Sequence, residues 1–404
     1  MSKDRTSTPL SNASKHHADT RLTTKGRSPE TNFGIVNPPV YHTSTVTFPT
    51  VAALHDAEKH RFDRVYYGRY GTPTSFAFEE AVADLEGAAH CVAVPSGMAS
   101  IALALAAVMH AGEHVLVTDS AYFPTVKYCN GFLKKFGVEV TYFDPMIDAD
   151  GLRALMRPNT RAVFVEAPGS ITFEVQDISM IAEVAHQHGA IVIMDNTWSA
   201  GYYFKPFEHG VDISLQAATK YIVGHSDAML GAVTMNDRDI YEHVKIAQVG
   251  LGYSTAPDDA YLGLRGIRTL AVRLPRHETN GIRLAEFLAA RPEVETVLHP
   301  ALPSCPGHNI WKRDFTGASG LFGFVLKNSY SQDDIARMLD GMELFAMGWS
   351  WGGYESLIIP SDPAGMRTTY KWPHKQPVLR IHAGLENIDD LLCDLQAGLD
   401  RLTS

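Results

Sequence analysis

The stretch Ser214–Asp227 has the sequence SLQAATKYIVGHSD, and Lys220 lies at its centre. The apolar residues before and after Lys220 place a cationic side chain among apolar neighbours. Burial at such a position disfavours the ammonium form and lowers the pKa of the lysine amine. A neutral amine can attack carbonyl groups, so one interpretation is a nucleophilic lysine. The alternative is an ordinary strand-end lysine whose ammonium group reaches water.

Short apolar runs alternate with helix-like segments upstream of this stretch. Strands are predicted at 91–94, 114–118, 138–143, 161–165, 190–194 and 213–216, and helices at 75–87, 97–110, 125–136 and 178–188. This alternation predicts an α/β fold with a mostly parallel sheet and helices on both faces. Ligands bind such sheets beyond the carboxyl ends of the strands. The residues that follow the runs therefore form one candidate site: Ser96–Met98, Tyr122, Gly169–Ser170, Asp195 and Thr219–Lys220.

The two ends of the chain differ from this central part. Residues 1 to about 30 are polar without periodicity, which predicts a mobile tail, and the proline-rich stretch 37–49 predicts an extended arm. After about 255, one long helix is expected over 258–289 with a break near Pro275, followed by fewer, mixed strands and helices. We therefore predict an N-terminal tail and arm (1–60), a large domain (61–256) and a smaller α+β C-terminal domain (257–404).

Composition excludes several classes of protein. The chain has 404 residues, 45% of them hydrophobic, and a formal net charge of −10, which argues against nucleic-acid binding. No apolar run reaches the roughly 20 residues that a membrane helix requires, and no apolar segment follows the basic N-terminus as in a secretory signal. The four cysteines form no C-x-x-C pattern, which argues against a metal site and favours a cytoplasmic location.

The stretch around Lys220 resembles the lysine signature of the Cys/Met-metabolism family of pyridoxal-phosphate (PLP) enzymes. In that signature Thr-Lys is followed by an aromatic residue, an apolar pair and Gly-His-Ser. The resemblance extends from about Thr20 to Leu402. It implies the aspartate-aminotransferase-like fold (fold type I), with PLP as cofactor. It also implies that Lys220 binds PLP covalently and acts in catalysis, and that Thr219 is a phosphate ligand.

The resemblance assigns further cofactor contacts. Asp195 begins an Asp-Asn-Thr motif, and an Asp in this family keeps the pyridine nitrogen protonated so that the ring accepts electrons; taken alone, it could simply cap a turn. Gly97 and Met98 open a helix that Ser96 caps, and free N–H groups at a helix start suit a phosphate. Tyr122 is expected to stack on the ring and to relay a proton, although a tyrosine there is more often a core or rim residue.

Another motif implies a shared active site. Tyr67-Gly68-Arg69 matches the Tyr-x-Arg element that reaches the phosphate in the neighbouring subunit of family members. A guanidinium suits a phosphate because it can bond two of its oxygens. The alternative is an exposed loop arginine. The resemblance thus predicts at least a homodimer, and a homotetramer is the family expectation.

The substrate is expected to be a small amino acid. Arg380 is a charged residue inside a predicted strand, and a buried Arg needs an anionic partner. In the family this partner is the α-carboxylate of the substrate. Ser350 is expected to be a second carboxylate contact and Trp351 a wall of the pocket. Ser170 is also expected to line the substrate site.

Several segments are closest to the β-eliminating branch of the family. The γ-acting members differ at Gly169–Ile171, Tyr122–Thr125 and Ser350–Gly353. The resemblance therefore implies a carbon–sulfur β-lyase that cleaves L-cystathionine to homocysteine, pyruvate and ammonia. Phe123 stands where such lyases carry an acid, which leaves the exact substrate open. The alternatives are a γ-lyase or γ-synthase, a broad cysteine desulfhydrase, and a regulator on the same fold that no longer catalyses.

Overall fold

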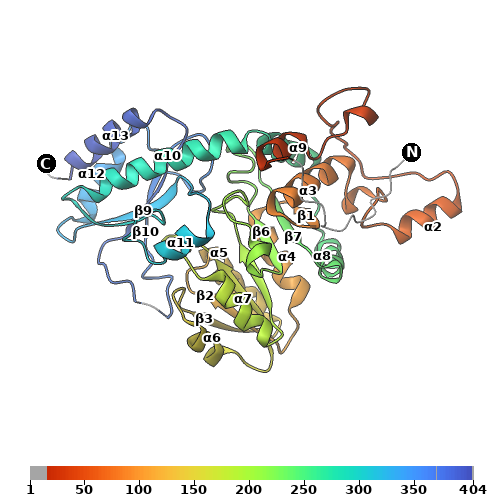
Figure 1. The fold of residues 1–404 in the computed structure, drawn as a ribbon, viewed down its shortest axis with the longest axis horizontal. Helices are drawn as coiled ribbons and strands as arrows, with labels where there is room; N and C mark the ends of the chain where they lie inside the picture. The colour runs from red at the N-terminus through yellow and green to blue at the C-terminus, as the bar shows by residue number, and fades with distance from the viewer. Residues whose placement is uncertain (1–15, 370, 403–404) are drawn as a thin grey trace.

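The structure, a computed structural model, describes residues 16–369 and 371–402. It contains two sheets, each packed against its own helices (Figure 1). The seven-stranded sheet has the order β1-β7-β6-β5-β4-β2-β3, and the four-stranded sheet has the order β10-β11-β9-β8. The strands are β1 (His90–Val94), β2 (His114–Thr118), β3 (Glu139–Phe143), β4 (Thr160–Glu166), β5 (Ile191–Asp195), β6 (Ile213–Gln216), β7 (Gly231–Met235), β8 (Val294–Leu298), β9 (Leu321–Leu326), β10 (Leu357–Ser361) and β11 (Val378–His382).

Helices cover both faces of the large sheet because its strands are apolar on both sides. In β4, Ala162 and Phe164 pack on one face, and Val163 and Val165 pack on the other. Such runs are typical of parallel strands buried on both faces. The helices are α1 (Ala18–Thr24), α2 (Val51–Lys59), α3 (Pro73–Glu86), α4 (Gly97–Val108), α5 (Phe123–Tyr128), α6 (Ala149–Leu155), α7 (Ile178–Gln187), α8 (Arg238–Leu251), α9 (Pro257–Ile267), α10 (Leu270–Ala289), α11 (His308–Asp314), α12 (Gln332–Asp340) and α13 (Ile388–Asp400).

The large sheet is mostly parallel, as predicted. Strands β2 to β6 pair in parallel, and only β7, which has no counterpart in the sequence prediction, runs antiparallel to β1 and β6. The carboxyl ends of β4 and β5 lie side by side, with Glu166 paired to Asp195 in the register. These ends form the edge at which ligands are expected.

The small domain is α+β, also as predicted. All strand pairs of its sheet are antiparallel, and α10, α12 and α13 share a core with it. The predicted helix break near Pro275 is wrong: Pro275 lies inside α10, and the break is at Arg268–Thr269. There the Gly266 carbonyl accepts hydrogen bonds from the Thr269 N–H and from Nη2 of the buried Arg273. In a continuous helix the Gly266 carbonyl would accept from the N–H four residues later. Thr269 and Arg273 take the place of that donor where α9 ends.

The predicted mobile tail is wrong for residues 16–30, and residues 1–15 lie outside the described part of the chain. Helix α1 is held against the large domain because Leu22 is buried and Arg21 pairs with Asp84 at 2.9 Å. Arg268 also donates to the Leu22 carbonyl at 2.7 Å. These partners are distant in sequence, so local composition does not reveal them. The arm at 37–49 contains no helix or strand, but α2 follows it.

Among the described residues, no helix is both long and apolar enough to cross a bilayer.

Candidate active site

Lys220 lies in the turn that follows β6, and its amine is enclosed by residues of the small domain. Its Nζ donates to Ser350 Oγ at 2.5 Å and lies 5.4 Å from the centre of the Trp351 ring. Burial and the nearby Arg380 guanidinium together lower the pKa of Lys220 to about 8, and Asp195 opposes the shift. At neutral pH about a tenth of the amine is therefore deprotonated, far more than for an ordinary lysine, and this neutral fraction can act as a nucleophile.

The loop that carries Ser350 approaches the Lys220 backbone closely. Ser350 has φ 81° and Gly352 has φ 90°, a region that side chains rarely adopt. A Cβ on Gly352 would lie 2.9 Å from Lys220 Cα, so only glycine fits there. The fully buried His382 closes this loop, because its Nε2 accepts from the Gly352 N–H and its Nδ1 donates to the Glu355 carbonyl.

Arg380 extends from β11 toward the same loop. Its Nη2 donates to the Ser350 carbonyl at 3.0 Å. Burial lowers the pKa of Arg380 to about 10, and no carboxylate in the described part of the chain forms an ion pair with it. A cation enclosed in this way is suited to an anionic ligand, such as the carboxylate of an amino acid.

Asp195 is a buried carboxylate at the end of β5. Thr197 donates to its Oδ1 through both the backbone N–H (3.0 Å) and the hydroxyl (2.6 Å). Burial raises the pKa of Asp195 to about 6, while the Thr197 hydrogen bonds and Lys220 oppose the shift. Among the described residues, Oδ2 accepts no hydrogen bond. The site therefore fits a protonated ring nitrogen such as that of PLP, which would supply the missing donor and countercharge.

Glu166 is a second, half-buried carboxyl group beside Asp195, and sequence reasoning missed it. Its Oε2 accepts from the Tyr122 N–H at 2.7 Å. Burial, and then repulsion by Asp195, raise the pKa of Glu166 well above its usual range. Two adjacent carboxyl groups rarely ionise together, so Glu166 keeps its proton and Asp195 carries the charge. The available signal was the position of Glu166 at a strand end, which it shares with Asp195.

Tyr122 and Ser170 belong to neighbouring loops at this edge. The Ser170 N–H donates to the Ser120 carbonyl at 2.7 Å, which joins the two loops. Burial, followed by the neighbouring carboxyl groups of Glu166 and Asp195, raises the pKa of Tyr122. Tyr122 thus keeps its phenolic proton at neutral pH and can act as a proton donor.

The start of α4 offers a place for a phosphate. Ser96 Oγ accepts from the Ala99 N–H, which leaves the N–H groups of Gly97 and Met98 facing away from the helix ladder. A Cβ on Gly97 would lie 2.4 Å from Ala217 Cβ, so glycine lets α4 contact the turn that leads to Lys220. A phosphate at this helix start is favourable because of the free donors and the helix dipole.

Three predicted residues lie outside this cluster of contacts. The Thr219 hydroxyl is bonded to the backbone of Leu230, donating to its carbonyl (3.1 Å) and accepting from its N–H (2.9 Å). Its role as a phosphate ligand stays a prediction. Tyr67 and Arg69 are exposed and lie in the loop that follows α2, where Arg69 donates to the Val249 carbonyl at 2.5 Å. Their predicted role concerns a neighbouring subunit, and a single chain does not test it.

Within residues 16–369 and 371–402, no group of three or more His, Cys, Asp or Glu side chains is arranged to hold a metal ion.

Comparison with known proteins agrees with this geometry. The sequence matches the family described as Cys/Met metabolism PLP-dependent enzyme over residues 19–400. It is 44% identical to a cystathionine β-lyase of Escherichia coli over 95% of this chain and 98% of that protein. It is 41% identical to a cystathionine β-lyase of Haemophilus influenzae over 96% of this chain and 99% of that protein. A solved cystathionine γ-synthase from Xanthomonas oryzae matches with a TM-score of 0.88 at 32% identity, covering 96% of this chain and 99% of that chain.

The unequal ionisation of the two carboxyl groups is testable with isosteric amides. We expect Glu166→Gln to bind PLP as the wild type does, because an amide resembles the neutral acid and still accepts from Tyr122. We expect Asp195→Asn to bind PLP about tenfold or more weakly, because it loses a charged hydrogen bond. Affinity for PLP added to the apoprotein is the measurement. Tighter binding by Asp195→Asn than by Glu166→Gln would contradict the assignment.

The lowered pKa of Lys220 predicts how the apoprotein captures PLP. The rate should rise with pH through about 8, because only the deprotonated amine attacks the aldehyde. Arg380→Ala should move this midpoint to higher pH, because it removes a nearby positive charge. Stopped-flow absorbance measures the rate. Arg313→Ala, which alters an exposed guanidinium on α11, is the control and should leave the midpoint unchanged. A rate that does not vary between about pH 7 and 9 would refute this reading.

Proposed function

Because the chain belongs to the Cys/Met metabolism PLP-dependent enzyme family, we propose that it is a β-lyase acting on L-cystathionine. The reaction consumes one water and yields L-homocysteine, pyruvate and ammonia. The observation that carries the proposal is the Lys220 amine, held by Ser350 beside Arg380 and with its pKa lowered toward neutrality. Identity to the two named β-lyases, at 44% and 41%, exceeds the 32% identity to the γ-synthase.

Four features support PLP binding by this chain. PLP, when bound, supplies an electron sink that stabilises negative charge at the substrate α-carbon. In the proposal Asp195 holds the ring nitrogen, Tyr122 covers the ring, and the N–H groups of Gly97 and Met98 hold the phosphate. Lys220 provides the covalent attachment. Thr219 is retained as a proposed contact to the phosphate, although its hydroxyl is engaged with Leu230.

The small domain supplies the substrate contacts. Arg380 and Ser350 bind the α-carboxylate in the proposal, because Arg380 lacks a carboxylate partner among the described residues and already contacts the Ser350 backbone. Trp351 forms a wall of the pocket and Ser170 lines the opposite side. A carboxylate fixed in this way directs the α-C–H bond toward Lys220, which removes the proton as a general base.

Cleavage of the Cβ–S bond requires a proton on the leaving sulfur. Lys220 carries the proton taken from the α-carbon and can return it. Tyr122 is a second donor, because its raised pKa keeps the phenol protonated. The product homocysteine would serve methionine biosynthesis, and a cytosolic location is consistent with the four free cysteines.

Loss of the Lys220 amine should nearly abolish turnover. We expect Lys220→Ala to be almost inactive and Tyr122→Phe to be slower by a smaller factor, since one acid–base group contributes about 10²–10⁴-fold. The measurement is release of keto acid and thiol from L-cystathionine. Pyruvate is the expected keto acid. Formation of 2-oxobutyrate would assign the protein to the γ-acting branch, and PLP binding without any turnover would favour a regulator or another substrate. Wild-type turnover by Lys220→Ala would refute the role of Lys220.

The proposal includes a homo-oligomer with shared active sites, at least a dimer and a tetramer by family expectation. The N-terminal arm, here taken as residues 31–60 with α2 included, projects from the large domain (Figure 1) and exposes apolar side chains. Phe33 is 98% exposed and Val51 is 71% exposed. Apolar surface of this kind favours a protein interface. A second copy of the chain that covers the arm would receive Tyr67 and Arg69 near its own phosphate site.

Charge on the arm should therefore weaken assembly. We expect the double variant Phe33→Asp/Val51→Asp to dissociate toward monomer and to lose activity with it, measured by analytical ultracentrifugation and by pyruvate release. Phe136→Asp is the matched control, because Phe136 is 61% exposed near β3, away from the arm. An arm variant that assembles like the wild type would show that the arm is not part of the interface.

A further inference from the structure

The connection between β10 and β11 is far longer than the sheet requires. These strands are antiparallel neighbours, and Ser361 pairs with Val378 at the end where the chain leaves β10 and enters β11. Hairpin connections usually have about 2–5 residues, and much longer ones tend to be functional. Here the chain runs through residues 362–377, of which residue 370 lies outside the described part. We call residues 362–377 the strap.

The strap leaves the small domain and binds a buried carboxylate of the large domain. Asp119 follows β2 and is 2% exposed. Thr368 donates to it through its N–H (2.8 and 3.0 Å) and its hydroxyl (2.8 Å). Thr369 does the same through its N–H and its hydroxyl (both 2.9 Å). Two consecutive residues thus satisfy both oxygens of one ionised acceptor, and hydrogen bonds to charged groups are the stronger kind.

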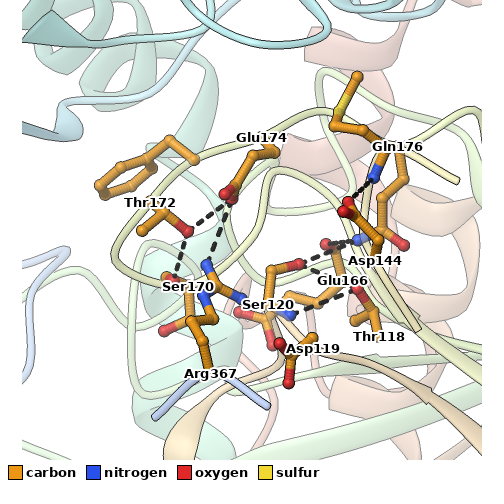
Figure 2. A network of polar contacts seen from close by, with 12 residues as sticks. Thr118, Asp119, Ser120, Asp144, Glu166, Ser170, Thr172, Glu174, Gln176 and Arg367 are labelled. Atoms are coloured by element: carbon orange, nitrogen blue, oxygen red, sulfur yellow. Dashed lines mark hydrogen bonds and ion pairs between the residues drawn. The ribbon is translucent and has the colours of Figure 1, made fainter. Parts of the chain in front are cut away.

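A second anchor lies beside the first. Arg367 Nη2 lies 3.4 Å from Glu174 Oε2, and their side chains are 4% and 9% exposed. Thr172 donates to the same Glu174 oxygen at 2.5 Å. Figure 2 shows Arg367 directed at Glu174, with Ser170 and Thr172 beside them. An ion pair this enclosed loses much of its hydration, so it is stable only when its two charged groups are well positioned. The hydrogen bonds from Thr368 and Thr369 to Asp119 lie next to it and help to position Arg367.

Both anchors belong to the loops that carry proposed active-site residues. Asp119 immediately precedes Ser120–Tyr122, and the Ser120 carbonyl accepts from the Ser170 N–H. The Glu174 carbonyl accepts from the Gly169 N–H at 2.9 Å. At its other end the strap continues into β11, where Arg380 is the third residue. The strap therefore connects the proposed carboxylate-binding Arg380 with the loops of Tyr122 and Ser170.

We propose that Asp119 is a positioning residue that, by binding Thr368 and Thr369, fixes Arg380 of the small domain relative to Tyr122 and Lys220. Its effect falls on binding of the substrate carboxylate, whereas cofactor binding depends on the large-domain residues. The inference rests on the proposed function for the identity of the substrate. The connection that the strap makes between Asp119 and Arg380 does not depend on which substrate the protein binds.

The test compares three variants of the PLP-loaded enzyme. Asp119→Ala removes both acceptor oxygens. Asp119→Asn keeps one of them and should show a smaller effect. Asp362→Asn is the control, because among the described residues the Asp362 carboxylate accepts only from the Ala364 N–H within the strap. Should Asp119→Ala fail to fold, the double variant Thr368→Val/Thr369→Val removes the two hydroxyl donors and leaves Asp119 in place.

Two readouts separate positioning from general stabilisation. Hydrogen–deuterium exchange should show faster uptake in residues 362–377 of Asp119→Ala, with uptake around Asp195 and Lys220 unchanged. The KM for L-cystathionine should rise about tenfold or more, with a smaller fall in kcat and with PLP retained. Asp362→Asn should match the wild type in all of these measurements.

Glycine distinguishes failure of this inference from failure of the proposed function. Its carboxylate can be titrated through the visible absorption of bound PLP, whether or not the protein cleaves cystathionine. Weaker glycine binding by Asp119→Ala, together with faster exchange in the strap, supports the inference even if cystathionine is not the substrate. Unchanged exchange in the strap, or faster exchange with unchanged glycine affinity and KM, would overturn it.

Discussion

The enclosure of the Lys220 amine is the constraint on which the rest of the site depends. An ammonium group loses hydration when it is buried, and a neighbouring guanidinium makes the charged form still less favourable. Lys220 belongs to the large domain, whereas Ser350, Trp351 and Arg380 belong to the small domain. The chemistry of the amine is thus created by the contact between the two domains. This contact between the domains requires a left-handed backbone at Ser350. It also requires glycine at position 352, because a side chain there would collide with the Lys220 backbone.

A second constraint acts along the strand ends of the large sheet. Parallel pairing aligns Glu166 with Asp195, and loss of hydration raises the pKa of both carboxyl groups. One of the two must remain neutral, and the difference between their hydrogen bonds decides which. Asp195 receives two hydrogen bonds from Thr197, whereas the Glu166 side chain receives one from the Tyr122 backbone. The neutral Glu166 orients the loop of Tyr122, and the ionised Asp195 remains available to a positively charged ring nitrogen.

Much of this arrangement could be predicted from the sequence, because it depends on local pattern. Strands buried on both faces are continuous apolar runs, so the parallel sheet and the residues at its carboxyl edge were predictable, Lys220 and Asp195 among them. Features that depend on distant partners were not. Helix α1 needs Asp84 and Arg268, and the break between α9 and α10 needs donors that include Arg273. The roles of Glu166 and Asp119 likewise follow only from neighbours that the fold provides.

The distances along the chain between these partners also bear on synthesis. Lys220 meets Ser350 across 130 positions, and Asp119 meets Thr368 across 249. Lys220 is therefore synthesised, together with the strands of the large sheet, before the residues that enclose its amine. Until those residues are made, the amine is hydrated and largely protonated. Only when Ser350, Trp351 and Arg380 have emerged can the amine be enclosed and its pKa fall to about 8. During synthesis the Lys220 amine thus keeps the low reactivity of an ordinary lysine until most of the chain has been made.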